Sequence, residues 1–144
     1  MRVSAKAEYA CVAMLELAAY HGMPQPLRVK AIADAQDISP RFLVQILLQL
    51  KTAGLVNSVR GAAGGYQLAR PPERISLAEI IKAIDDRSLT PRPALASAGR
   101  TAAVNVLLEV WQEVHRQEQR LLETLTLAEL LRRTQENSAL VYQI

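Results

Sequence analysis

The stretch RGAAGGYQLAR, residues 60–70, combines arginines and glycines, the residue types that cradle phosphate groups. It holds three of the chain's six glycines between two arginines. A P-loop requires Gly-Lys-Ser/Thr at the opening of a helix, and a dinucleotide-binding loop requires GxGxxG between a strand and a helix. Here the glycine pair leads into YQLA, which is typical of a strand, so both nucleotide-binding interpretations fail.

The same stretch predicts the loop of a β-hairpin. GLVNSV before it and GGYQLA after it indicate strands at about 55–59 and 66–69. Glycines let the backbone take positive φ and approach another surface closely. Arg60, at the base of this loop, could bind phosphate or enter a minor groove.

Residues for catalysis or metal binding are too few and too scattered. The chain has one cysteine, Cys11, and two histidines, His21 and His115. This spacing matches no metal site, and a single cysteine excludes an intramolecular disulfide. Cys11 lies on the apolar side of a predicted helix, where a small buried hydrophobe is its simplest role. We therefore expect neither an enzyme nor a metal centre.

Two short helices precede the hairpin, at 28–36 and from Pro40 to about residue 53. Ser39 is a suitable N-cap for the second helix, Pro40 suits the first helical position, and Gly54 suits the C′ position. The short turn DIS between the two helices suggests a helix-turn-helix. The predicted buried stripe of the second helix is Leu43, Ile46, Leu47 and Leu50.

A helix-turn-helix followed by a hairpin is the order of a winged helix-turn-helix. The second helix of such a unit fits the DNA major groove, where arginine can contact guanine and glutamine can contact adenine. The pattern alone also allows an ordinary solvated face or a protein-docking module. The outward positions of this helix are Arg41, Val44, Gln45, Leu48, Gln49 and Thr52.

The remaining segments are also expected to be mostly helical. The first helix covers 4–20, and the capping-box sequences SLAE and TLAE open helices at 76–85 and 126–134. The proline- and alanine-rich segment 86–100 has no period and is expected to be a loop. A long helix is predicted from residue 101 to about 124.

The long helix carries an apolar seam close to a heptad pattern, which Glu118 interrupts. Such a helix packs either on its own domain or on a second copy of the chain. Pairing with a second copy is the more specific interpretation, because regulators that bind operators are usually dimers with twofold symmetry. The residues expected at a dimer contact are Val104, Leu107, Leu108, Trp111, Val114 and Leu121.

Charge and hydropathy narrow the class of partner. Residues 1–75 carry nine Lys/Arg and five Asp/Glu, whereas residues 76–144 carry eight Lys/Arg and nine Asp/Glu. A basic first half is a mild indication of a polyanion partner.

No apolar run approaches the ~20 residues of a membrane span. No signal peptide is expected from MRVSAKAEYACVAML, and the lone cysteine favours a reducing cytoplasm.

The chain resembles the Rrf-two family of winged-helix transcription regulators, of the IscR, NsrR and CymR type. The resemblance rests on KAEYACVAMLELA, on the central LRVKAIADAQDISPRFLVQILLQLKTAGLVNSVRGAAGGYQLAR, on ISLAEIIKAID and on TLAELL. The central block is specific, because it contains the family's recognition helix and wing in order. It implies a mainly α fold with a small β-hairpin wing, and a homodimer built on the long helix.

The resemblance also implies which residues meet double-stranded DNA. Val44 stands where the family often has glutamate, so contact with a thymine methyl replaces acceptance from cytosine, and the operator can differ. The expected DNA-binding residues are Arg28, Ser39, Pro40, Arg41, Phe42, Val44, Gln45 and Gln49 around the recognition helix, and Arg60, Gly61, Gly64, Gly65 and Tyr66 in the wing.

One departure from the family concerns iron. Cluster-binding members carry three cysteines in the region equivalent to 86–105, and this chain has none there. The last family cysteine corresponds to Asn105, and a histidine ligand of some members corresponds to Leu108. Neither side chain can replace a thiolate or an imidazole toward iron. We therefore expect no cofactor, and a small-molecule effector remains unidentified.

These inferences combine into one prediction. Residues 1–86 form a winged helix-turn-helix DNA-binding domain, 87–100 a loop, and 101–144 a dimerisation helix with a short C-terminal helix. The chain is predicted to be a cytoplasmic, homodimeric, sequence-specific regulator of transcription, a repressor without a cluster. The alternative is a module that docks on a partner enzyme. For the predicted regulator, three signals stay open: a small ligand, a partner protein or oxidation of Cys11.

Overall fold

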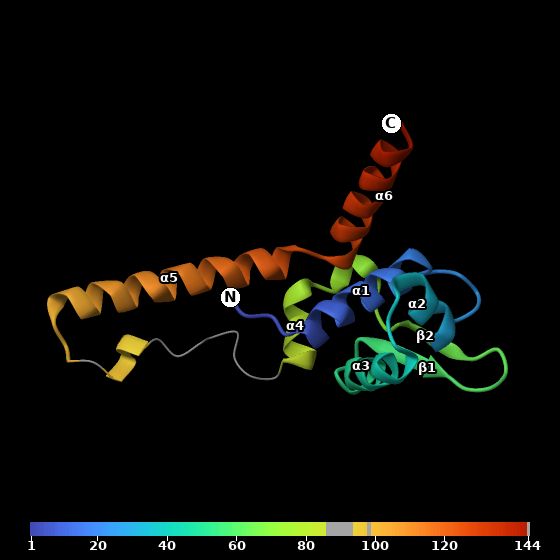
Figure 1. The fold of residues 1–144 in the computed structure, drawn as a ribbon, viewed down its shortest axis with the longest axis horizontal. Coiled ribbons are helices and arrows are strands. Elements are labelled where there is room, and N and C mark those ends of the chain that lie inside the picture. The colour runs from blue at the N-terminus through green and yellow to red at the C-terminus, as the bar shows by residue number, and fades with distance from the viewer. Residues whose placement is uncertain (86–93, 98, 144) are drawn as a thin grey trace.

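The computed structural model describes residues 1–85, 94–97 and 99–143, and it is mainly helical with one antiparallel hairpin (Figure 1). This confirms the predicted fold class. In chain order the elements are α1 (Ala5–Ala19), α2 (Val29–Gln36), α3 (Pro40–Thr52), β1 (Val56–Val59), β2 (Gly65–Leu68), the 3-10 helix η1 (Pro72–Arg74), α4 (Leu77–Ile84), the 3-10 helix η2 (Ala94–Ser97), α5 (Ala102–Thr124) and α6 (Leu127–Gln143).

The core lies where α1 packs against α2, α3, α4 and the start of α6. Small residues let the neighbours of α1 approach closely, since Ala7, Ala10 and Ala13 are fully buried. Burying an aliphatic side chain of Leu or Ile size contributes about 1.5–3 kcal/mol. The predicted stripe of α3 is buried as expected, and its members Leu43, Ile46, Leu47 and Leu50 have no exposed surface.

Capping bonds fix the ends of α1. The Ser4 hydroxyl accepts a hydrogen bond from the Ala7 amide at 3.0 Å and donates to Asp85 Oδ1 at 2.5 Å. The Ser4 amide donates to Asp85 Oδ2 at 3.0 Å. Because Asp85 is the C-cap of α4, these bonds join the start of α1 to the end of α4.

The other predicted caps have mixed outcomes. Ser76 and Thr126 each accept from the amide three residues on, at 3.3 and 3.2 Å. Ser39 occupies the N-cap position of α3 as predicted, but its side chain makes no capping hydrogen bond. Pro40 does occupy the first turn of α3, and Gly54 adopts a φ of +79° just after the helix.

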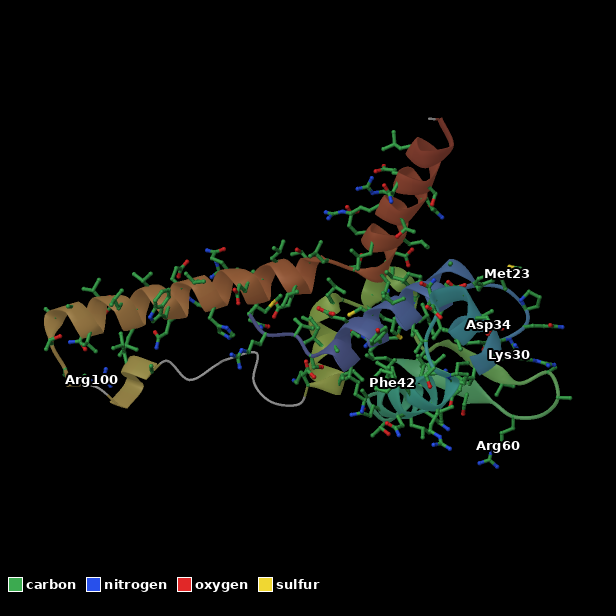
Figure 2. All side chains as sticks on the ribbon, in the orientation of Figure 1. Met23, Lys30, Asp34, Phe42, Arg60 and Arg100 are labelled. Carbon is green, nitrogen blue, oxygen red and sulfur yellow. The ribbon has the colours of Figure 1, made fainter. Side chains whose placement is uncertain are left out.

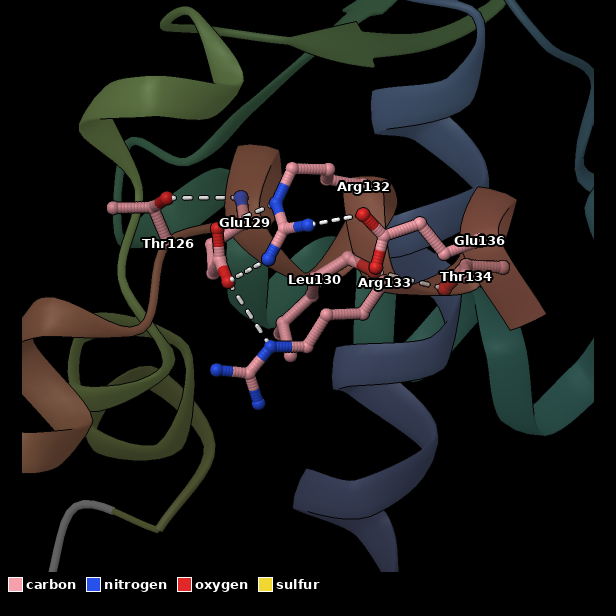
Figure 3. Close-up of polar contacts among 7 residues, drawn as sticks. All are labelled: Thr126, Glu129, Leu130, Arg132, Arg133, Thr134 and Glu136. Carbon is pink, nitrogen blue, oxygen red and sulfur yellow. Dashed lines mark hydrogen bonds and ion pairs between the residues drawn. The ribbon is translucent and has the colours of Figure 1, made fainter.

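The last helix is longer than predicted. It was expected to end near Thr134, whereas α6 extends over 17 residues to Gln143. Glu129 accepts from Arg132 at 2.7 Å and from Arg133 at 3.1 Å, and Arg132 also bonds Glu136 (Figure 3). Each such exposed pair contributes a few tenths of a kcal/mol to a helix, which favours extension without an apolar pattern.

The first turn of α6 belongs to the core. Leu127 is fully buried, its amide donates to the Ile75 carbonyl at 2.9 Å, and the Leu77 amide donates to the Leu125 carbonyl at 2.9 Å. The chain therefore returns from α5 to the start of α4. The division of the chain at residue 101 into two functional parts stays a prediction.

Helix α5 projects away from the packed helices (Figure 1). Within it, Leu122 is the one buried residue. The segment 86–100 was expected to be a loop throughout, but Ala94–Ser97 forms the short helix η2. Residues 86–93 and 98 lie outside the described residues.

Candidate nucleic-acid interface

The outward face of α3 combines a cation, an amide and apolar side chains. Because its opposite stripe is fixed in the core, Arg41, Val44, Gln45 and Leu48 are exposed. Val44 and Leu48 keep 39% and 51% of their surface accessible. A helix of 13 residues spans about 20 Å, and its diameter of about 10–12 Å fits the major groove.

Two residues predicted at the groove lie on the flanks of α3 instead of its outer face. Phe42 is half-buried and its ring meets Tyr9 of α1 edge-on, with centroids 5.8 Å apart at 87°. Gln49 is half-buried, and its Oε1 atom is buried without a hydrogen-bond partner. At 100° per residue, positions 42 and 49 adjoin the buried stripe, whereas 41, 45 and 48 lie opposite it.

The hairpin is held in a register that pairs Val56 with Leu68 and Val59 with Gly65. Steric constraints explain why glycine occupies two positions of the hairpin loop. Gly61 adopts a φ of +104°, a conformation that side chains with a Cβ disfavour. A Cβ at Gly64 would lie 2.2 Å from the Val59 carbonyl oxygen.

A third extended segment pairs with the hairpin. The Leu27 amide donates to the Tyr66 carbonyl at 3.0 Å, and the Tyr66 amide donates to the Leu27 carbonyl at 2.7 Å. The approach is so close that a Cβ at Gly65 would lie 2.1 Å from the Leu27 oxygen. Leu27 was absent from the predicted site, because a single pair of backbone bonds leaves no periodic signal in the sequence.

The arginines of this region have different surroundings. Arg60 is exposed and projects away from the hairpin (Figure 2). Arg28 is also exposed, but its guanidinium donates to the carbonyl of Ala62 at the hairpin tip. Arg70 pairs with Glu79 of α4 at 3.0 Å, which ties the end of β2 to α4. Tyr66 is half-buried against the core, so it supports the base of the hairpin.

Positive charge is concentrated on this part of the molecule. Residues 28–74 contain seven Lys/Arg and three Asp/Glu, whereas α5 contains two Arg and four Glu. Lys30 is paired with Asp34 at 2.8 Å, and this hydrogen bond raises the pKa of Lys30. The surface of α3 and the hairpin is therefore the part of the described chain best suited to a polyanion.

Helix α5 presents an exposed apolar stripe. Of the predicted dimer residues, Leu107, Trp111, Val114 and Leu121 are 43–60% exposed, and Val104 and Leu108 are half-buried. Val106 and Val110 widen the stripe, and the heptad pattern did not include them. Exposed apolar residues along one helix are what a helix that pairs with a second surface would present.

The residues present do not fit an iron–sulfur cluster. The chain's one cysteine lies in α1, and among the described residues no group of three or more His, Cys, Asp and Glu could hold a metal. Asn105 is exposed and Leu108 is half-buried on α5. Burial, followed by the charges of Glu8 and Asp85, raises the pKa of the Cys11 thiol to about 11. Cys11 is thus protonated at neutral pH, which opposes a redox role.

Among the described residues, no helix is both long enough and apolar enough to span a bilayer.

The chain is similar to known proteins in sequence and in fold. The Rrf2 family model, described as an iron-dependent transcriptional regulator, matches residues 3–133. The chain is 39% identical over 130 residues to slr0846 of Synechocystis, provisionally named an HTH-type transcriptional regulator, covering 90% of this chain and 87% of that one. The structure of CymR, the global cysteine regulator of B. subtilis, superimposes with a TM-score of 0.81 at 31% identity, covering 92% and 98%. That of T. potens IscR gives 0.75 at 36% identity, covering 95% and 90%.

Proposed function

Because the chain belongs to the Rrf2 family of transcriptional regulators, we propose that it binds operator DNA as a homodimer and represses transcription without an iron–sulfur cluster. Family membership makes it a helix-turn-helix regulator and not an enzyme. The observation that supports the finer proposal best is that the outer face of α3 and Arg60 of the hairpin are both exposed.

In the proposed complex, α3 lies in the major groove and the hairpin is the wing. Arg41 and Gln45 have the donors and acceptors that base edges require, and Val44 offers apolar contact to a thymine methyl. Arg60 reaches the adjacent minor groove or its phosphates. Phe42 and Gln49 act indirectly, by supporting α3 on the core.

The proposed dimer forms through α5. The stripe around Trp111 is exposed in the single chain, and a second copy would bury it by twofold pairing. Two recognition helices related by a twofold axis reach successive major grooves, which are about 34 Å apart. The operator is accordingly expected to be a pseudo-palindrome.

The absence of a cluster is proposed from the donor set. A cluster of the usual kind needs several thiolates, and each chain supplies one cysteine, held in α1 with a raised pKa. Purified protein is expected to be colourless, and elemental analysis is expected to find no stoichiometric iron. Iron bound in proportion to protein would overturn this part of the proposal.

The DNA proposal is tested by selecting genomic fragments with the purified full-length protein. Binding to a selected fragment is then titrated by anisotropy at several salt concentrations, and affinity should fall linearly on a log–log plot. A reporter driven by that fragment should lose expression when the protein is supplied. Protein that selects no DNA but binds a partner protein through α3 would instead support the docking alternative. The exposed apolar side chains of Val44 and Leu48 are the observation that favours this alternative.

A further inference from the structure

Arg28 connects two parts of the proposed DNA-binding surface. It is the N-cap residue of α2, and its guanidinium donates to the Ala62 carbonyl at the tip of the hairpin. We propose that Arg28 is a positioning residue of the wing, which acts on DNA binding through the hairpin tip and not by contacting phosphate. This inference rests on the proposed function, because it concerns how the wing is presented to DNA.

The tip needs an external support. The paired strands end at Val59 and Gly65, and within the tip the Gly64 amide donates to the Gly61 carbonyl at 3.0 Å. Ala62 and Ala63 are exposed and have methyl side chains that contribute little packing. A segment with few buried contacts opens at low free-energy cost. The Arg28 bond reaches the tip at Ala62, one of its exposed residues.

Arg28 is itself well fixed. The residue before it, Leu27, is held by two backbone hydrogen bonds to Tyr66, and the residue after it begins α2. Its backbone therefore cannot shift without disturbing either the hairpin or the helix-turn-helix. A planar guanidinium on such an anchor is pre-organised, which makes it a better support than a side chain on a free loop.

The consequence concerns Arg60. Arg60 immediately precedes Gly61, whose φ of +104° lies in the tip that Arg28 supports. If the tip loosens, Arg60 loses its fixed direction, and ordering it again on DNA costs binding free energy. Arg28 should thus act on affinity largely through Arg60.

The test compares Arg28→Ala, Arg60→Ala and the double variant with wild type on one selected operator fragment. Losing one exposed hydrogen bond predicts that Arg28→Ala weakens binding by about 3- to 10-fold, with the slope of log affinity against log salt unchanged. The double variant should bind about as well as Arg60→Ala alone. The matched control pairs Arg41→Ala with Arg60→Ala, whose losses should add because Arg41 lies on α3 away from the tip.

A measurement without DNA separates positioning from charge. In the free protein, Arg28→Ala should speed hydrogen exchange at the Gly64 amide and leave the amides of α3 unchanged. Unchanged exchange together with a salt slope reduced by about one would show that Arg28 contacts a phosphate, and the proposal would be wrong. Wild-type affinity in Arg28→Ala would also overturn it. Wild-type protein that selects no DNA refutes the proposed function itself.

Discussion

Alanine at Gly65 would force the hairpin away from the segment that supports it. The added Cβ would lie 2.1 Å from the Leu27 oxygen and 2.5 Å from its carbonyl carbon, both rigid backbone atoms. Contacts this short cannot be relieved by a side-chain rotation, so one of the two strands must move. The two backbone hydrogen bonds between Leu27 and Tyr66 would lengthen or break.

The loss of stability in Gly65→Ala is the sum of a steric cost and a hydrogen-bond cost. Overpacking of this kind typically costs about 1–3 kcal/mol, and each lost backbone bond adds about 0.5–1.5 kcal/mol. A chain of 144 residues shifts its Tm by about 2–4 °C for each kcal/mol. We therefore expect Gly65→Ala to lower the Tm by at least about 3 °C. Its operator affinity should fall as well.

The assay is thermal unfolding followed by circular dichroism, with hydrogen exchange at the Leu27 and Tyr66 amides. Gly99→Ala is the control, because a Cβ there has no heavy atom within 4 Å. Gly99→Ala should leave the Tm unchanged or slightly raised. Equal melting of Gly65→Ala and wild type, with unchanged protection at Leu27, would refute the steric reasoning.

Four further outcomes are expected. Arg60→Ala should weaken operator binding by about 1–3 kcal/mol in an anisotropy titration, and unchanged binding would remove Arg60 from the interface. Trp111→Ala should shift sedimentation from dimer to monomer while each chain stays folded, because the indole is 49% exposed in the single chain. A variant that remains dimeric would exclude Trp111 as an anchor. Cys11 should resist alkylation in native protein at pH 8, because its pKa is raised to about 11. Since that folded pKa exceeds the ordinary value of 9.0, wild type should lose stability relative to Cys11→Ala between about pH 9 and 11, and parallel pH profiles would contradict the shift.

Much of the fold follows from local signals in the sequence. The stripe Leu43, Ile46, Leu47 and Leu50 identifies the buried face of α3, and so identifies Arg41 and Gln45 as outward residues. Capping sequences located the starts of α4 and α6. These predictions succeed because helix period and capping depend on residues within one turn of each other.

Sequence patterns predict less well where a second segment or a side-chain network determines the local structure. Helix α6 continues past Thr134 on ion pairs that an apolar pattern does not detect. Ser39 is the N-cap residue of α3 as predicted, but its side chain makes no capping hydrogen bond. Phe42 and Gln49 are half-buried beside the stripe, Phe42 against Tyr9 of α1, so their direct contact with DNA stays a prediction.

The sequence by itself determined the helix-turn-helix, the hairpin, the apolar seam of α5 and the lack of ligands for a cluster, because each depends on residue types and short spacings. That the seam of α5 is exposed in the single chain came only from the structure. The tertiary structure alone decided that Leu27 pairs with Tyr66, that Gly65 must be small and that Arg28 holds the hairpin tip. Those contacts join residues more than thirty positions apart. They exist only because packing of α1, α2 and α3 brings the two segments together, and no local period encodes that meeting.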